Sequence, residues 1–143
     1  MKYLVDTNII SELIKSNADE LVLNFLESID SSLLFLSVVT IGEIEFGIEK
    51  VKSGKKKTDL KHWLYDELLV LFQDKIIDID SKVMIEWGRL SALSQSRGLT
   101  LPVMDSLIAA TCLVGKYTLI TRNTKDFENV PGLDFVNPFE VRH

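Results

Sequence analysis

Short apolar runs alternate along the chain with longer stretches in which apolar residues recur at helical spacing. The runs have no helical period and are rich in β-branched and aromatic residues, so they predict buried strands at 3–5, 33–36, 76–79, 117–120 and 135–136. The periodic stretches predict helices at 9–15, 19–29, from 37 or 40 to 51, and at 62–72, 80–98 and 102–114. Strands separated by helices predict a parallel sheet with helices on both faces, which is an α/β fold.

The lysine-rich stretch around Ser53 and Gly54 has no apolar period and is expected to be a loop. The segment 121–126 is expected to be a polar turn after the fourth strand.

The size of the chain fits one ordinary globular domain, and we expect a single domain over 1–143. With 46% hydrophobic residues and a mean hydropathy of +0.16, the chain can bury a substantial core. Its longest uncharged run, 31–42, is too short to span a bilayer, and the first residues lack the pattern of a secretory signal. We therefore expect a cytoplasmic protein with no membrane partner.

The chain has few cysteine and histidine residues that could serve in catalysis or metal binding. Cys112 is the only cysteine and lies in an apolar segment, which predicts a small core residue. His62 and His143 are the only histidines, so zinc sites and histidine-based triads are disfavoured.

The net charge of -5 hides a local basic cluster, because six of the sixteen basic residues lie between Lys50 and Lys61. They are Lys50, Lys52, Lys55, Lys56, Lys57 and Lys61. Such a cluster is either a solvated surface or a site for phosphate groups.

Four acids lie beside apolar elements at one predicted edge of the sheet. Asp6 and Asp126 follow strands, and Glu43 and Asp105 lie in early turns of helices that leave the same edge. Each acid also has a structural interpretation. Asp6 is an N-cap candidate, Glu43 completes a capping-box spacing with Thr40, Asp105 suits a helix N-terminus, and Asp126 could be a loop residue.

Four carboxylates in one pocket repel one another unless a cation neutralises them. A site of carboxylates without cysteine or histidine favours a hard, oxygen-preferring ion, and Mg²⁺ or Mn²⁺ is therefore the expected cofactor.

Four ordered motifs make the chain similar to a known family: Leu4–Asn8, Ser37–Glu43 with Gly47, Asp105–Ala110 and Leu119–Phe127. Together they resemble the PIN-domain family, and within it the VapC-type toxins with their FitB-like relatives. The resemblance implies an α/β/α sandwich, a ribonuclease dependent on Mg²⁺ or Mn²⁺, neutralisation by a small antitoxin, and a homodimer.

Carried over by motif, Asp6, Glu43 and Asp105 match the metal-site acids of the family. Some members have an acid where Asn123 stands, and Asp126 ranks ahead of Asn123 as the fourth position. The remaining candidates support the site or contact RNA. The supporting residues are Asn8, Thr121 and Asn123, and the RNA contacts are Arg122, Lys55, Lys56 and Lys57.

The expected mechanism is attack by a metal-activated water, with Asp6 and Asp105 as ligands and Glu43 holding or deprotonating the water. Cleavage by water leaves a 5′-phosphate and a 3′-hydroxyl. Two other functions share parts of this pattern. A haloacid-dehalogenase-like phosphatase or a receiver domain also places an acid after the first strand, but the phosphatase needs a second acid where Asn8 stands, and the receiver domain needs an acidic pair and a late lysine. A non-catalytic partner-binding domain is disfavoured because all four acids are present.

Overall fold

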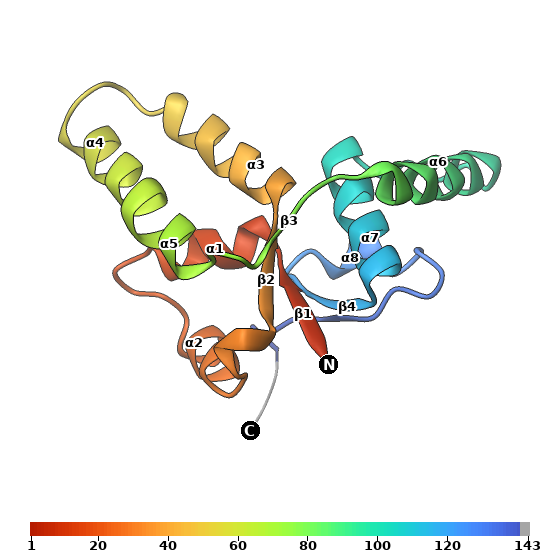
Figure 1. Cartoon of the computed structure of the whole chain (residues 1–143), viewed down its shortest axis with the longest axis horizontal. Coiled ribbons are helices and arrows are strands. Elements are labelled where there is room, and N and C mark those ends of the chain that lie inside the picture. The colour runs from red at the N-terminus through yellow and green to blue at the C-terminus, as the bar shows by residue number, and fades with distance from the viewer. Residues whose placement is uncertain (141–143) are drawn as a thin grey trace.

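The centre of the fold is a parallel sheet of five strands in the order β3-β2-β1-β4-β5 (Figure 1). The computed structural model describes residues 1–140, so the last part of the predicted domain, 141–143, lies outside the described residues. The strands are β1 (Lys2–Val5), β2 (Leu34–Ser37), β3 (Ile76–Ile77), β4 (Tyr117–Ile120) and β5 (Phe135–Val136). All four pairings are parallel, so the prediction of a parallel sheet is confirmed.

Helices cover both faces of this sheet, as Figure 1 shows on either side of β1 and β2. One face carries α1 (Thr7–Leu13), α2 (Glu20–Glu27), α3 (Val38–Glu49), α4 (Lys55–His62) and α5 (Leu69–Leu71), with a π-helical segment Trp63–Leu68 joining the last two. The other face carries α6 (Ser81–Ser96), α7 (Val103–Gly115) and α8 (Thr124–Phe127). A 3₁₀ turn, Ser31–Leu33, precedes β2. The predicted three-layer α/β/α sandwich is confirmed.

Alternation along the central strands divides the core into two halves. Leu4 and Leu119 are buried against α6, α7 and α8, whereas their neighbours Val5 and Ile120 are buried against α1, α3 and the π-helical segment. Successive side chains of a strand point to opposite faces, so β1 and β4 supply both halves of the core. Cys112 is buried in the first half, as predicted.

The start of α3 shows whether Thr40 and Glu43 form a capping box. Ser37 is the N-cap of this helix, because its Oγ accepts the Val39 N–H at 3.0 Å. Thr40 and Glu43 therefore lie inside the helix and do not form the capping box that their spacing allows.

The expected loop around the lysines is wrong in part, because α4 begins at Lys55, directly after Gly54. The non-helical segment is confined to 50–54 and ends at Gly54, whose φ of +146 a residue with a side chain rarely adopts. The last residues of the predicted turn 121–126 likewise belong to the four-residue helix α8. In the described part of the chain, no helix is long and apolar enough to cross a membrane.

Candidate active site

Asp6 is the most enclosed of the candidate acids, with 4% of its surface exposed. It ends β1, and the Ile120 carbonyl accepts its backbone N–H at 2.9 Å, which holds it at the end of β4. The carboxylate accepts the Thr7 N–H at 2.8 Å, the Thr121 hydroxyl at 2.7 Å and the Asn8 amide at 3.4 Å. Asp6 is therefore both the N-cap of α1 and a fixed carboxylate at the carboxyl edge of the sheet.

Neutral donors surround this carboxylate. Burial raises the pKa of Asp6, and the nearby charge of Glu43 raises it further, whereas the hydrogen bonds from Thr121, Thr7 and Asn8 lower it. Among residues 1–140, no basic side chain forms an ion pair with Asp6. The negative charge at this position is thus oriented by the protein without being neutralised by it.

Glu43 of α3 is held by a hydrogen bond from α1. The Thr7 hydroxyl donates to Glu43 Oε1 at 2.6 Å and lies 3.2 Å from the hydroxyl of Thr40, which is itself buried. Because Thr7 follows Asp6 directly, this bond brings the α3 carboxylate to the side of the α1 start where Asp6 lies. Thr7 and Thr40 were not predicted as site residues. The only signal for Thr7 was its position between two candidate residues after the first strand.

Asp105 lies in the first turn of α7 and is half-buried. Burial, the charges of Asp6, Asp126 and Glu43, and contact with the Asp126 carboxylate raise the pKa of Asp105 to about 6. All three other candidate acids therefore lie within electrostatic range of Asp105, and we call these four acids the carboxylate cluster.

Asn123 and Asp126 lie together. The Asn123 side-chain amide donates to Asp126 Oδ2, and the Asn123 backbone N–H donates to Thr121 Oγ1 at 3.0 Å. Thr121 in turn bonds Asp6. Asn123 therefore positions the carboxylate of Asp126 beside the cluster, which favours Asp126 over Asn123 as the fourth acid.

The carboxylate cluster fits a hard divalent cation in donor type and in charge, since it offers only oxygen ligands and excess negative charge. Among residues 1–140, no three acidic, histidine or cysteine side chains already converge on a common point at ligand distances. Binding an ion at this cluster therefore requires rotation of side chains, for which the half-buried Asp105 and Asp126 have more freedom than Asp6.

Arg122, a predicted RNA contact, packs against the C-terminal segment. Its guanidinium lies 4.3 Å from the centre of the Phe139 ring, and its backbone N–H donates to Asn8 Oδ1 at 3.1 Å. Arg122 is not among the groups that shift the pKa of Asp6 or of Asp105.

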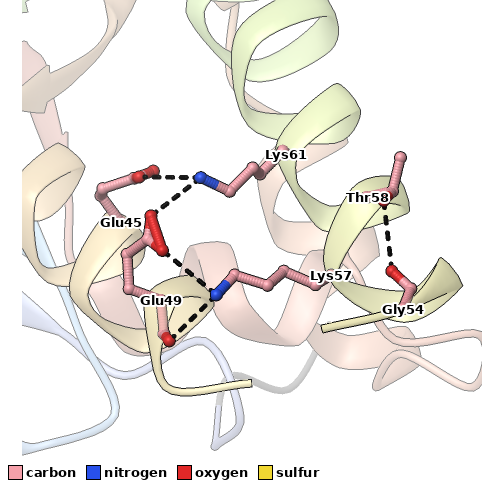
Figure 2. A network of polar contacts seen from close by, with 6 residues as sticks. All are labelled: Glu45, Glu49, Gly54, Lys57, Thr58 and Lys61. Carbon is pink, nitrogen blue, oxygen red and sulfur yellow. Dashed lines mark hydrogen bonds and ion pairs between the residues drawn. The ribbon is translucent and has the colours of Figure 1, made fainter. Parts of the chain in front are cut away.

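Lysines of the basic cluster pair with acids of α3 (Figure 2). Lys57 lies 3.2 Å from a Glu49 carboxylate oxygen, and Lys61 bonds the same carboxylate at 2.8 Å while lying 3.6 Å from Glu45. These two lysines lower the pKa of Glu49 to about 2. Lys57 and Lys61 therefore form ion pairs between α4 and α3, which hold the two helices together.

The other two lysines of the predicted RNA contact, Lys55 and Lys56, face solvent. Lys55 pairs with Asp59 at 2.9 Å on the exposed side of α4, whereas Lys56 forms no ion pair within residues 1–140. Of the three predicted lysine contacts, Lys56 is the one whose charge is most available to a phosphate.

The fold and the cluster define the class of protein. A PIN domain matches residues 3–133, and the chain belongs to the PIN-domain family. It is 32% identical over 137 residues to the VapC ribonuclease Y4jK of Sinorhizobium fredii, covering 96% of this chain and 97% of that protein. It is also 32% identical over 124 residues to the toxin FitB of Neisseria gonorrhoeae, covering 87% and 89%.

Solved structures agree with this assignment. The structure of FitAB bound to an IR36 DNA fragment matches with a TM-score of 0.91 and 29% identity, covering 99% of this chain and 98% of that chain. FitAcB from Neisseria gonorrhoeae matches with a TM-score of 0.90 and 29% identity, covering 97% and 99%. The resemblance to VapC-type and FitB-like PIN domains is confirmed.

Proposed function

We propose that this protein is the toxin of a toxin–antitoxin pair and acts as an endoribonuclease that depends on Mg²⁺ or Mn²⁺. The observation that carries the proposal is the environment of Asp105, whose pKa is raised by burial and by the charges of three other acids, Asp6, Asp126 and Glu43. Four neighbouring carboxylates with no basic partner among residues 1–140 favour a divalent cation as the missing charge. The nuclease and toxin names of the relatives support the reaction class.

Asp6 and Asp105 are the expected direct ligands, with Glu43 and Asp126 completing the site. When bound, a divalent cation supplies positive charge to the phosphoryl oxygens and acidifies a coordinated water. Asp6 needs little reorganisation for this role, since Thr7, Thr121 and Asn8 already orient it.

Glu43 is the expected acceptor for the proton of the attacking water. The Thr7 hydroxyl fixes one carboxylate oxygen of Glu43 at 2.6 Å, which leaves the other oxygen for the water. Attack by water, and not by the ribose hydroxyl, leaves a 5′-phosphate and a 3′-hydroxyl.

The phosphatase alternative is disfavoured by the surroundings of Asn8. Both ends of its amide are used, since Nδ2 donates to Asp6 and Thr121 and Oδ1 accepts the Arg122 N–H. Asn8 therefore joins the start of α1 to the end of β4 and supplies no second acid for an aspartyl-phosphate mechanism.

The proposed partners are an RNA substrate, a small cognate antitoxin and a second copy of the chain, in the cytoplasm. Support for the antitoxin comes from the structures of the relatives, which are FitAB and VapBC complexes. Support for a homodimer comes from the family resemblance, and the exposed apolar side chains of α6 and α7, among them Ile85 and Met104, offer surface for it.

Induced expression tests the proposal. We expect the wild type to arrest bacterial growth and the Asp6→Asn variant to be tolerated at the same protein level, because an amide cannot supply the anionic ligand. Asp134→Asn is the matched control, since Asp134 is exposed and precedes β5 at the opposite edge of the sheet. Equal toxicity of the wild type and Asp6→Asn contradicts the proposal.

A further inference from the structure

A cavity of about 310 Å³ lies between α6 and α7, beside the carboxylate cluster. We call it the α6–α7 cavity. Its lining includes one aromatic and several uncharged polar side chains, which are Trp87, Ser91, Ser94, Gln95, Thr100 and Ser106. Ser106 directly follows the candidate ligand Asp105 on α7, so the cavity begins at the same helix end as the cluster.

A second hollow of about 140 Å³ adjoins this cavity on the side of Asp126. The second hollow is also lined by Asp126 and Lys125, and the residues that the two share are Ser94, Leu99, Thr100 and Leu101. A ligand in the α6–α7 cavity that continues past these shared residues therefore comes to Asp126, one of the four acids. Lys125 lines this second hollow, and the positive charge of its ammonium group suits the phosphates of a nucleic-acid strand.

The aromatic wall of the cavity is fixed before any ligand binds. The Trp87 indole N–H donates to Ser106 Oγ at 2.8 Å, and Ser106 Oγ donates to the Val103 carbonyl at 2.7 Å. The one polar group of the indole is thus satisfied by the protein. A ring held in this way stacks on a planar ligand at low entropic cost.

Four other polar side chains of the lining are free to contact a ligand, Ser91 and Ser94 half-buried and Gln95 and Thr100 exposed. Within residues 1–140, the side chains of Ser91, Ser94, Gln95 and Thr100 form no hydrogen bond with the protein. They offer an amide and three hydroxyl groups, which can both donate and accept. An aromatic ring beside such groups matches the two features of an unpaired nucleobase, a planar π-face and an edge of donors and acceptors.

We propose that the α6–α7 cavity binds one unpaired base of the RNA strand whose phosphodiester lies at the carboxylate cluster. The placement of that phosphodiester rests on the proposed function. A paired base has its edge and faces covered by its neighbours in the helix, so the cavity selects single-stranded or splayed-out RNA. It adds a base contact to a site that otherwise recognises only phosphate.

Fluorescence anisotropy with labelled nine-nucleotide RNAs tests this proposal. The full-length protein in EDTA is titrated with oligomers of A, of C and of U, and with an abasic ribose-phosphate oligomer of the same length and charge. We expect at least one base-containing oligomer to bind about 5-fold or more tightly than the abasic oligomer, within the range known for base stacking on aromatic side chains.

The cavity variant is Trp87→Phe with Ser94→Ala and Gln95→Ala, and it should reduce the difference between the base-containing and abasic oligomers, because the ring is smaller and two polar contacts are removed. The matched control, Ser53→Ala with Gln73→Ala, changes exposed residues outside the cavity and should keep the full difference. If the loss of the Trp87 bond to Ser106 unfolds the first variant, Ser94→Ala with Gln95→Ala leaves that bond intact and should still reduce the difference.

An unchanged difference in the folded cavity variants overturns the proposal, as does a wild type that binds abasic and base-containing RNA equally. Cleavage of the same RNA after addition of Mn²⁺ is scored separately. If the wild type binds with a base preference that the cavity variants lose but does not cleave, the proposed function is contradicted and the cavity assignment stands. If the wild type cleaves but binds without any base preference, the proposed function stands and the cavity assignment is contradicted.

Discussion

Replacing Asp105 by asparagine should stabilise the metal-free protein while removing its activity. Burial of the Asp105 carboxylate, together with repulsion from three nearby acids, raises its pKa to about 6 from an ordinary 3.8. Folding therefore disfavours the charged form. The amide introduced by Asp105→Asn carries no charge, and the substitution relieves this repulsion without a large change in side-chain volume.

The size of the effect follows from the pKa. A rise from 3.8 to about 6 corresponds to about 3 kcal/mol between charged and neutral forms, at about 1.36 kcal/mol for each tenfold change in the proton equilibrium. Because Asp105 is only half-buried, solvent screens part of this energy, and we expect a gain of about 1–2 kcal/mol in the free energy of unfolding at neutral pH.

The sign of the pH dependence is fixed by the direction of the shift. The native state binds the Asp105 proton more tightly than the unfolded chain does, so wild-type stability falls as pH rises from 3.8 to about 6 and stays lower above that range. The advantage of Asp105→Asn should thus be largest near neutral pH and vanish below about pH 4.

Urea denaturation in EDTA, at neutral pH and below about pH 4, measures this effect. Asp134→Asn is the control for a generic loss of charge. Equal or lower stability of Asp105→Asn at neutral pH refutes the electrostatic reasoning, as does a gain that is the same at both pH values. Addition of Mn²⁺ should stabilise the wild type more than the variant, because binding to the native state alone raises its stability.

Three further predictions concern other parts of the site. Thr7→Val should lower kcat about tenfold or more with little change in KM, whereas Thr7→Ser should keep most of kcat, because only the hydroxyl orients Glu43; equal activity of the two variants removes Thr7 from the positioning role. Joint replacement of Lys55, Lys56 and Lys57 by glutamine should weaken RNA binding and flatten its salt dependence, with most of the change already present in Lys56→Gln, and an unchanged slope assigns them to the solvated surface. The favourable coupling between Glu49→Gln and Lys61→Met in thermal unfolding should be present at neutral pH and fade as pH falls toward about 2, where Glu49 becomes protonated; coupling that does not change with pH contradicts the ion-pair interpretation.

The positions of the four acids could be predicted because they depend on the direction of the strands. Apolar runs are visible in the sequence, and the carboxyl ends of parallel strands meet at one edge, so Asp6 and Asp126 were expected to lie near each other. Glu43 and Asp105 followed from the helices that leave this edge. The roles of these acids in catalysis remain predictions.

The start of α4 could not be predicted from apolar periodicity. Lys55, Lys56 and Lys57 carry no apolar face, and the helix is tied down by acids of α3 such as Glu49, which lie earlier in the chain. The same limit applies to the bond between Thr7 and Glu43 and to the α6–α7 cavity. Each needs two helices in a known relative position, which a pattern of single positions does not give.

RNA cleavage by the purified protein, with the cut ends identified, tests the central claim most directly. The account predicts cleavage that requires Mg²⁺ or Mn²⁺, is lost in EDTA and in Asp6→Asn, persists in Asp134→Asn, and leaves 5′-phosphate and 3′-hydroxyl ends. Cleavage that survives EDTA and Asp6→Asn, or ends that carry a 2′,3′-cyclic phosphate, would contradict it.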